Sequence, residues 1–346
     1  VVGQIALSLL LVAGAGLFAR SLYNLRAIDP GFVADRLLQL RVDAALNSYA
    51  GPQALVLASR LRQELTSITR VTAVSVATVP AMMNGFGFQT VRVQGYDPAA
   101  GEDMNSMINS VGPGYVATLG VPLLQGRDFT DSDIDGGQRV AIINEAMANR
   151  FWKGENPIGR RFGRQSETGS EIEVVGVVRD SRFANLRDDV RMGYYIPLAQ
   201  SGSLNGFTFY VRHRATDAAI APAVRQAVTR VDPRLPVYHF RTMENQIAES
   251  MYIERLVSSL SALFGLLALG LAAVGLYGVM SHAVAQRRRE IGIRIALGAE
   301  RMSVLWNVLR QVLMLAVAGV VLGLPAALGA GQLIESLLFG LAPLDP

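Results

Sequence analysis

The sequence predicts an α-helical membrane protein that carries a large water-soluble α+β domain in the middle of the chain. Three runs contain no Asp, Glu, Lys or Arg, at residues 1–19, 256–285 and 311–334. They match or exceed the roughly 20 residues that a helix needs to cross a bilayer. Residues 28–254 have globular composition, with strand and helix patterns separated by Gly and Pro. About three transmembrane helices are therefore expected.

The charge and residue usage exclude several kinds of site. The net charge is +4, and it comes almost entirely from arginine because Lys153 is the only lysine. In a membrane protein a basic balance reports cytoplasmic loops more often than nucleic-acid binding, so no nucleic-acid partner is expected. The chain has no cysteine, which excludes disulfides, thiolate metal sites and cysteine nucleophiles.

The first apolar run predicts a transmembrane helix over residues 1–27. At a rise of 1.5 Å per residue its charge-free part spans roughly 28 Å, close to the hydrocarbon thickness of a bilayer. A signal peptide is the alternative, but the chain lacks an initiator Met and a basic leading region, and the run is longer than the apolar core of such a peptide. The start at Val1 suggests a piece cut from a longer chain.

The central domain, expected at residues 28–250, contains two β-α-β units that lie far apart in the sequence. Each has an alternating strand, a helix and a second strand. The first unit covers residues 37–42, 53–68 and 71–79, and the second covers 207–212, 217–231 and 237–241. Two such units side by side form the split β-α-β fold of ferredoxin type. One lobe is expected from residues 28–94 and 207–250, with a second lobe, residues 95–206, inserted into it.

The inserted lobe shows elements of its own. The patterns predict a helical turn near 114–119, a strand at 139–144, a helix at 145–152 and a strand at 171–178. Between the first two lie four acidic residues, Asp128, Asp131, Asp133 and Asp135. They lack the glycine and the closing glutamate of a calcium-binding loop, so a solvated turn is expected.

A helix that begins after Thr242 is expected to continue without interruption into the second apolar run. Threonine is a good N-cap residue, and Met243, Ile247 and Met251 share one helix face. As a helix, residues 256–285 would span about 45 Å, against about 30 Å of hydrocarbon. Part of the helix is therefore expected to project from the membrane as a stalk.

Small residues on the two later membrane helices predict close helix contacts. Gly319 and Gly323 are four residues apart, and so are Ala268 and Ala272 on the preceding helix. Small residues at this spacing let neighbouring membrane helices approach closely. The alternative is that Gly and Ala are simply common in apolar helices.

The polar segment at residues 286–301, QRRREIGIRIALGAER, separates the two later apolar runs. It holds five arginines and two glutamates, and short arginine-rich loops stay on the cytoplasmic side. The central domain is therefore expected to be extracytoplasmic. Gly298 can end a helix in the left-handed conformation, which predicts a short helix over residues 286–299.

This short helix has two distinct faces. Glu290 and Arg294 form an i,i+4 pair in the favourable order, and Ile291 and Ile295 lie together on one side. Such a helix is either a membrane-surface helix with basic anchors or a docking helix for a cytoplasmic partner. The residue pattern alone leaves both interpretations open.

No catalytic pattern is present. The chain has no GxxxxGK[ST] phosphate loop, no HExxH metal motif and no GxSxG nucleophile elbow. Its three histidines, His213, His239 and His282, are scattered and are expected to be structural or exposed. We therefore expect no enzymatic activity, cofactor or metal in this chain.

Several segments together resemble one family of transport proteins. The run from Gly275 to Gln311, GLYGVMSHAVAQRRREIGIRIALGAERMSVLWNVLRQ, resembles the permease domain of the FtsX and MacB superfamily of ABC transporters. The segments Val140 to Phe162, Glu173 to Phe183 and Tyr194 to Gln200 resemble the MacB-type periplasmic core domain. The resemblance covers essentially the whole chain and is closest to one unit of the duplicated permeases described in acidobacteria.

This resemblance implies roles for the polar segment. In the superfamily, the part of the chain that reads REIGIRIALGA here is the coupling helix that sits on a cytoplasmic ABC ATPase. It implies an ATPase-coupling role for Arg289, Glu290, Ile291, Arg294, Ile295 and Gly298. Members have four membrane helices per unit, so residues 251–346 would form a permease domain whose fourth helix follows LLFGLAPLDP. The ATPase itself is expected on a separate polypeptide.

The resemblance also implies a function, a location and partners. It predicts a permease subunit in the bacterial inner membrane that couples ATP hydrolysis to movement of its extracytoplasmic domain, for export or efflux. Besides the ATPase and the bilayer, the expected partners are a second permease unit, in a dimer or pseudo-dimer, and a periplasmic protein. The alternatives are a mechanotransducer that regulates a cell-wall hydrolase or a sensor, and a lipoprotein-release subunit, which would need an apolar cleft between the two lobes.

Overall fold

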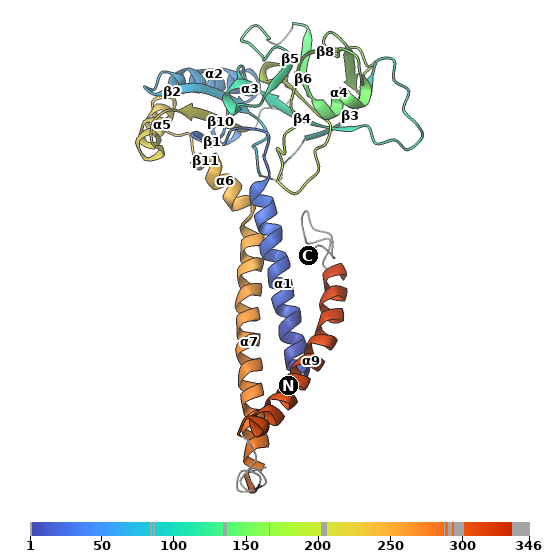
Figure 1. The fold of residues 1–346 in the computed structure, drawn as a ribbon. Coiled ribbons are helices and arrows are strands. Elements are labelled where there is room, and N and C mark those ends of the chain that lie inside the picture. The colour runs from blue at the N-terminus through green and yellow to red at the C-terminus, as the bar shows by residue number, and fades with distance from the viewer. Residues whose placement is uncertain are drawn as a thin grey trace. The chain divides into compact units, whose positions relative to one another are not determined.

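A computed structural model describes residues 2–333 except 84, 86, 134–136, 166, 202–205, 287, 290–292 and 294–300. The chain divides into two compact units (Figure 1). One is formed by Val1–Ile28 and Met251–Pro346, and the other by Asp29–Ser250. The first unit is thus built from the two ends of the sequence, and the second unit from its middle.

Three long helices form the first unit: α1 (Val2–Ala27), α7 (Tyr252–Gln286) and α9 (Arg301–Leu333). Within the described residues, α1, α7 and the part Val312–Gly329 of α9 are long and apolar enough to cross a membrane, by length and composition. Helix α1 contacts both α7 and α9 (Figure 1). The helices are apolar on nearly all sides, and many of their large side chains are exposed, as expected of surfaces that meet lipid. The prediction of about three membrane helices is confirmed.

The first lobe of the second unit has the predicted split β-α-β fold. Its elements are β1 (Leu37–Asp43), α2 (Pro52–Thr66), β2 (Val71–Ala77), β10 (Gly206–His213), α5 (Asp217–Val231) and β11 (Val237–Thr242). The strands lie in the order β11-β1-β10-β2, and all three neighbouring pairs are antiparallel. Helices α2 and α5 pack on each other. Their apolar faces close a core with the strands, in which Leu40, Leu61, Phe209 and Val224 are fully buried.

The inserted lobe extends the same sheet. It comprises β3 (Gly87–Val93), β4 (Asn105–Val111), α3 (Tyr115–Leu119), β5 (Leu123–Gly126), β6 (Arg139–Asn144), α4 (Glu145–Phe151), β7 (Arg161–Arg164), β8 (Ile172–Val178) and β9 (Gly193–Pro197). Asn144 caps α4 by accepting a hydrogen bond from Met147 N at 3.1 Å, and it also accepts one from Gly193 N at 2.9 Å. The cap side chain therefore ties the start of α4 to β9.

Strand β3 packs into the core of the inserted lobe and not into the core of the first lobe. Val91 and Val93 of β3 are buried in the core of the inserted lobe, together with Phe162 and Tyr194. The predicted boundary at residue 94 assigned these valines to the first lobe. The strand pairs with β4 and β7, both of which belong to the insert, so its apolar side chains enter the second core.

A strand pairing and a group of aromatic rings are among the contacts that join the lobes near β4. Ala77 of β2 pairs with Val111 of β4, so one sheet of eleven strands runs through both lobes. Next to this pairing, the ring of Tyr115 lies 5.9 Å from the ring of Tyr210 in the first lobe and 5.6 Å from that of Tyr195. Burial raises the pKa of Tyr195 to about 12. These phenols are neutral packing groups.

The expected continuous helix after Thr242 is interrupted. Thr242 caps α6 (Met243–Ser250) by accepting a hydrogen bond from Asn245 N at 3.2 Å, as predicted. A turn at Met251 then separates α6 from α7. Within its own unit α6 is held on the sheet by Gln246, which donates to Met82 O at 2.8 Å and contacts Gln39. The sequence shows no Gly or Pro at this turn.

Candidate functional site

The two predicted glycines of α9 lie against α1. A Cβ atom placed on Gly319 would be 2.7 Å from the Cβ of Ile5, and one placed on Gly323 would be 2.9 Å from the Cα of Ala6. Both separations are shorter than side chains tolerate, so the two backbones approach as closely as glycine allows. The spacing of four puts both glycines on the same helix face.

Helix α7 contacts a different face of α1 from the face that α9 contacts. Ser8 Oγ lies 2.8 Å from Ala268 O on α7 and 2.8 Å from Gln4 O on its own helix. The backbone at Gly275 approaches Gln4, since a Cβ there would lie 2.5 Å from the side-chain oxygen. Ala272, the other predicted alanine, is half-buried on α7. A polar contact therefore accompanies the small residues at this helix pair.

Both small-residue faces are thus directed at α1. The predicted residue pairs did not identify the partner helix, and they did not include Gly265 and Gly275 of α7. A Cβ on Gly265 would lie 3.5 Å from Val12 of α1. Gly265, Ala268, Ala272 and Gly275 follow one another at intervals of three, four and three residues, which is a signal that the sequence did contain.

Most of the predicted coupling segment lies outside the described residues. This holds for Glu290, Ile291, Arg294, Ile295 and Gly298. Arg289 is helical and exposed, and it follows the end of α7 at Gln286. The coupling role of all six residues remains a prediction.

The described carboxylates of the acidic cluster in the inserted lobe accept hydrogen bonds from backbone N–H groups or from arginine side chains. Asp128 accepts hydrogen bonds from Phe129 N at 2.7 Å and Ala117 N at 3.1 Å, while desolvation raises its pKa. Asp133 accepts two hydrogen bonds from Arg127, and this guanidinium lowers the pKa of the Asp133 carboxyl. Asp131 pairs with an arginine of α2, and Asp135 lies outside the described residues. The described acids therefore order the turn.

Three helices long and apolar enough to cross a membrane, with a two-lobed α+β domain between α1 and α7 in the sequence, define the class of membrane proteins that carry a large folded domain. Comparison with known families agrees. The family model of the MacB-like periplasmic core domain matches residues 1–231, and that of the FtsX-like permease C-terminal region matches residues 262–345. Because the first match covers more than half of the chain, the chain belongs to the MacB-like family of ABC transporter permeases, as its motifs predicted.

The relatives include proteins named as permeases and proteins named as ATP-binding/permease proteins. An ABC transporter permease of Bacillus subtilis, YknZ, is 24% identical over 242 residues, which cover 68% of this chain and 60% of the relative. The macrolide export ATP-binding/permease protein MacB of Rhodospirillum rubrum is 26% identical over 244 residues, which cover 67% of this chain and 37% of the relative. The pyoverdine export protein PvdT of Pseudomonas aeruginosa is 25% identical and is covered to 36%. The chain thus spans three fifths of these relatives' length or less.

Among solved structures, the periplasmic region of MacB from Actinobacillus actinomycetemcomitans aligns with 65% of this chain and 95% of its own. The alignment has a TM-score of 0.44 and 15% sequence identity.

Proposed function

We propose that the chain is the permease subunit of an exporter of the MacB and FtsX type, which couples ATP hydrolysis on a separate ATPase to movement of its extracytoplasmic domain. The observation that carries the proposal is the arginine-rich segment at residues 287–300 between the span-length helices α7 and α9. A short basic segment between two spans stays in the cytoplasm. Since α7 crosses the membrane once, the domain of residues 29–250 is on the side opposite to the basic segment, which is the periplasmic side of the inner membrane.

The coupling segment is where the ATPase binds. As a helix, this segment would place the opposite charges of Glu290 and Arg294 one turn apart, with Ile291 and Ile295 on an apolar face beside them. A docked helix of this kind passes the motion of the ATPase to the two spans that flank it. Two permease units, as a dimer or pseudo-dimer, face a pair of ATPase subunits, and a periplasmic partner receives the cargo.

The names of the relatives favour export over the alternatives. MacB and PvdT are named for the export of macrolides and of pyoverdine. None of the relatives described above is named for mechanotransduction or for lipoprotein release, and we do not propose these functions. The cargo of this chain follows from neither relative, because each is covered to less than two fifths of its length.

A charge exchange tests the coupling role. The double variant Glu290→Arg with Arg294→Glu keeps an opposite-charge pair on the helix but inverts the charges that face a partner. We expect the ATPase that copurifies with the full chain from its native membrane to be lost from the purified variant, or its stimulated ATP hydrolysis to fall about tenfold or more.

The matched control exchanges a pair far from the segment in sequence. Arg160 Nη2 and Glu155 Oε2 lie 2.7 Å apart and both side chains are more than half exposed. Glu155→Arg with Arg160→Glu is expected to leave ATPase copurification and hydrolysis unchanged. Unchanged copurification and hydrolysis in the Glu290 and Arg294 variant would show that the segment is a membrane-surface helix and not a coupling helix.

A further inference from the structure

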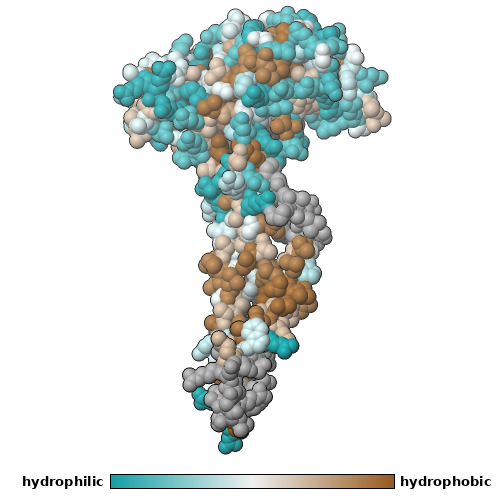
Figure 2. Space-filling view, viewed as in Figure 1, coloured by the Kyte–Doolittle hydropathy of each residue, from teal (hydrophilic) through white to brown (hydrophobic). Residues whose placement is uncertain are grey.

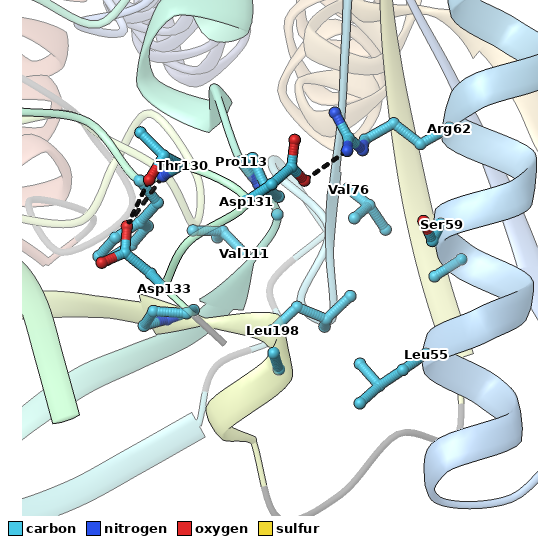
Figure 3. A pocket seen from close by; sticks show the side chains of 15 residues that line it. Leu55, Ser59, Arg62, Val76, Val111, Pro113, Thr130, Asp131, Asp133 and Leu198 are labelled. Atoms are coloured by element: carbon cyan, nitrogen blue, oxygen red, sulfur yellow. Dashed lines mark hydrogen bonds and ion pairs between the residues drawn. The ribbon is translucent and has the colours of Figure 1, made fainter. Parts of the chain in front are cut away.

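A pocket of about 200 Å³ opens where the first lobe meets the inserted lobe (Figure 3). Helix α2 and strand β2 form one wall, and the segments that follow β4, β5 and β9 form the other. Its lining is mainly apolar, with Leu55, Val76, Val111, Phe129 and Leu198 among the contributors. An engineered apolar cavity of roughly 150 Å³ admits benzene, so this pocket has room for a short hydrocarbon chain.

One ion pair joins the two walls. Arg62 Nη2 on α2 lies 2.6 Å from Asp131 Oδ1 on the segment after β5 (Figure 3). The side chain of Arg62 is only 22% exposed, whereas that of Asp131 is 75% exposed. Because Asp131 is largely exposed, water can solvate its carboxylate when a ligand takes its place on Arg62. Arg62 is the partly buried cation of the pocket, and Asp131 is a partner that a ligand can replace.

The second carboxylate of the lining does not favour a cationic ligand. Asp133 accepts hydrogen bonds from both terminal nitrogens of Arg127 at 2.8 Å, and one from Thr130 N at 2.9 Å. This bidentate pair neutralises its charge. A cationic ligand would have only the largely solvated carboxylate of Asp131 to bind. An anionic ligand can bind the partly buried guanidinium of Arg62.

We propose that this pocket binds a small anionic amphiphile, a carboxylate of the medium-chain fatty-acid class. Its hydrocarbon chain lies against Leu55, Val111 and Leu198, and its carboxylate replaces Asp131 on Arg62. A mainly apolar pocket with a few convergent polar groups is the usual form of a small-molecule site. Because Arg62 and Asp131 belong to different lobes, binding also opens the ion pair that joins the lobes at this point. This assignment is independent of the coupling role proposed above.

Photolabelling tests the proposal in the full chain in lipid nanodiscs, which avoid detergent in the pocket. The probe is a decanoate with a diazirine at the end of its chain, and labelled peptides are mapped by mass spectrometry. We expect labels within residues 52–66 and 111–133, measured relative to labels on α7, which report the probe dissolved in lipid. Free decanoate should compete for the pocket labels about tenfold better than decanol or decylamine, since one charged hydrogen bond distinguishes them.

Two variants and one control separate a site from simple partitioning. Arg62→Gln is expected to lower pocket labelling about tenfold, and Ala199→Phe, which fills the pocket from its half-exposed rim, to abolish it. Arg60→Gln, on the same helix but lining a different depression, should leave it unchanged. Circular dichroism confirms that each variant is folded. Equal competition by decylamine, or unchanged labelling in Arg62→Gln or Ala199→Phe, would overturn the proposal.

Discussion

The two units of this protein place large and small side chains in opposite positions. In the second unit the large apolar residues are inside, and Leu61 and Phe162 are fully buried. In the first unit such residues face outward, and apolar side chains cover much of the visible helix surface (Figure 2). Leu266, for example, is 68% exposed, whereas Gly319 and Gly323 lie at the contact of α9 with α1. Water favours the burial of apolar area, whereas lipid tails are as apolar as leucine and give no such drive. The difference teaches that the surrounding solvent decides which residues hold a unit together.

The largest expected effect comes from a core substitution in the second unit, where burial of apolar side chains from water provides the stability. Leu61→Ala removes a buried side chain of α2 from the core of the first lobe. The lost transfer energy and the cavity together are expected to reduce the free energy of unfolding of the second unit by about 2–5 kcal/mol. Guanidinium unfolding of the full chain in bicelles measures it, followed by the fluorescence of the buried Trp152 in a Trp306→Phe background.

The same substitution on α7 is the control. Leu266→Ala exchanges one lipid-facing apolar side chain for a smaller one, so the stability of the helix unit, measured by SDS unfolding in bicelles, is expected to change by less than about 0.5 kcal/mol. A loss at Leu266 as large as that at Leu61 would mean that this helix face is buried in an interface instead of meeting lipid.

The next effect concerns the glycines. Gly323→Leu would add a side chain at a position where even a Cβ atom would be 2.9 Å from Ala6 Cα and 3.0 Å from Ala6 O. Because the nearest atoms are backbone, they cannot move aside without separating α1 from α9. SDS unfolding in bicelles is expected to show a loss of about 1–3 kcal/mol, the usual cost of overpacking.

Gly270→Leu is the matched control on α7. Apart from its chain neighbours and the backbone of its own helix, no described atom lies within 4 Å of a Cβ at this position, which is exposed. The control is expected to retain or slightly raise helix stability, since leucine is the better helix former. If both variants were equally stable, the close approach of α1 and α9 would not contribute to the packing of the unit.

Much of the fold was predictable because local pattern and tertiary structure agree. The two β-α-β units have alternating strands and amphipathic helices, and α5 begins and ends at the predicted residues, Asp217 and Val231. The strands that were missed do not show such a pattern. Strand β4 reads NSMINSV, yet Ser106 and Asn109 are buried because Met192 O and Val79 O accept their hydrogen bonds. A polar strand whose partners lie far away in the sequence cannot be found from hydrophobic periodicity.

The candidate sites were predictable to different degrees for the same reason. The small-residue spacing on α7 and α9 is visible in the sequence, but the choice of α1 as the common partner depends on three-dimensional packing. The pocket was not predictable at all, since Arg62 and Asp131 belong to separate lobes and meet only after both have folded. Local sequence therefore indicates which face of an element makes contacts, whereas the meeting of two surfaces requires the fold.

The smallest expected effect sharpens the comparison, because it isolates the polar contribution to helix packing. Ser8→Ala removes the hydroxyl whose oxygen lies 2.8 Å from Ala268 O of α7. The hydroxyl has a single proton, and Gln4 O on its own helix competes for it, so the net interhelical gain is modest. We expect a loss of about 0.6 kcal/mol, the average for such bonds within membranes, from SDS unfolding in bicelles. Ser259→Ala is the control, since that hydroxyl bonds only Leu256 O of its own helix within the described structure. Equal losses in the two variants would assign the effect of Ser8 to local helix propensity instead of to the contact between α1 and α7.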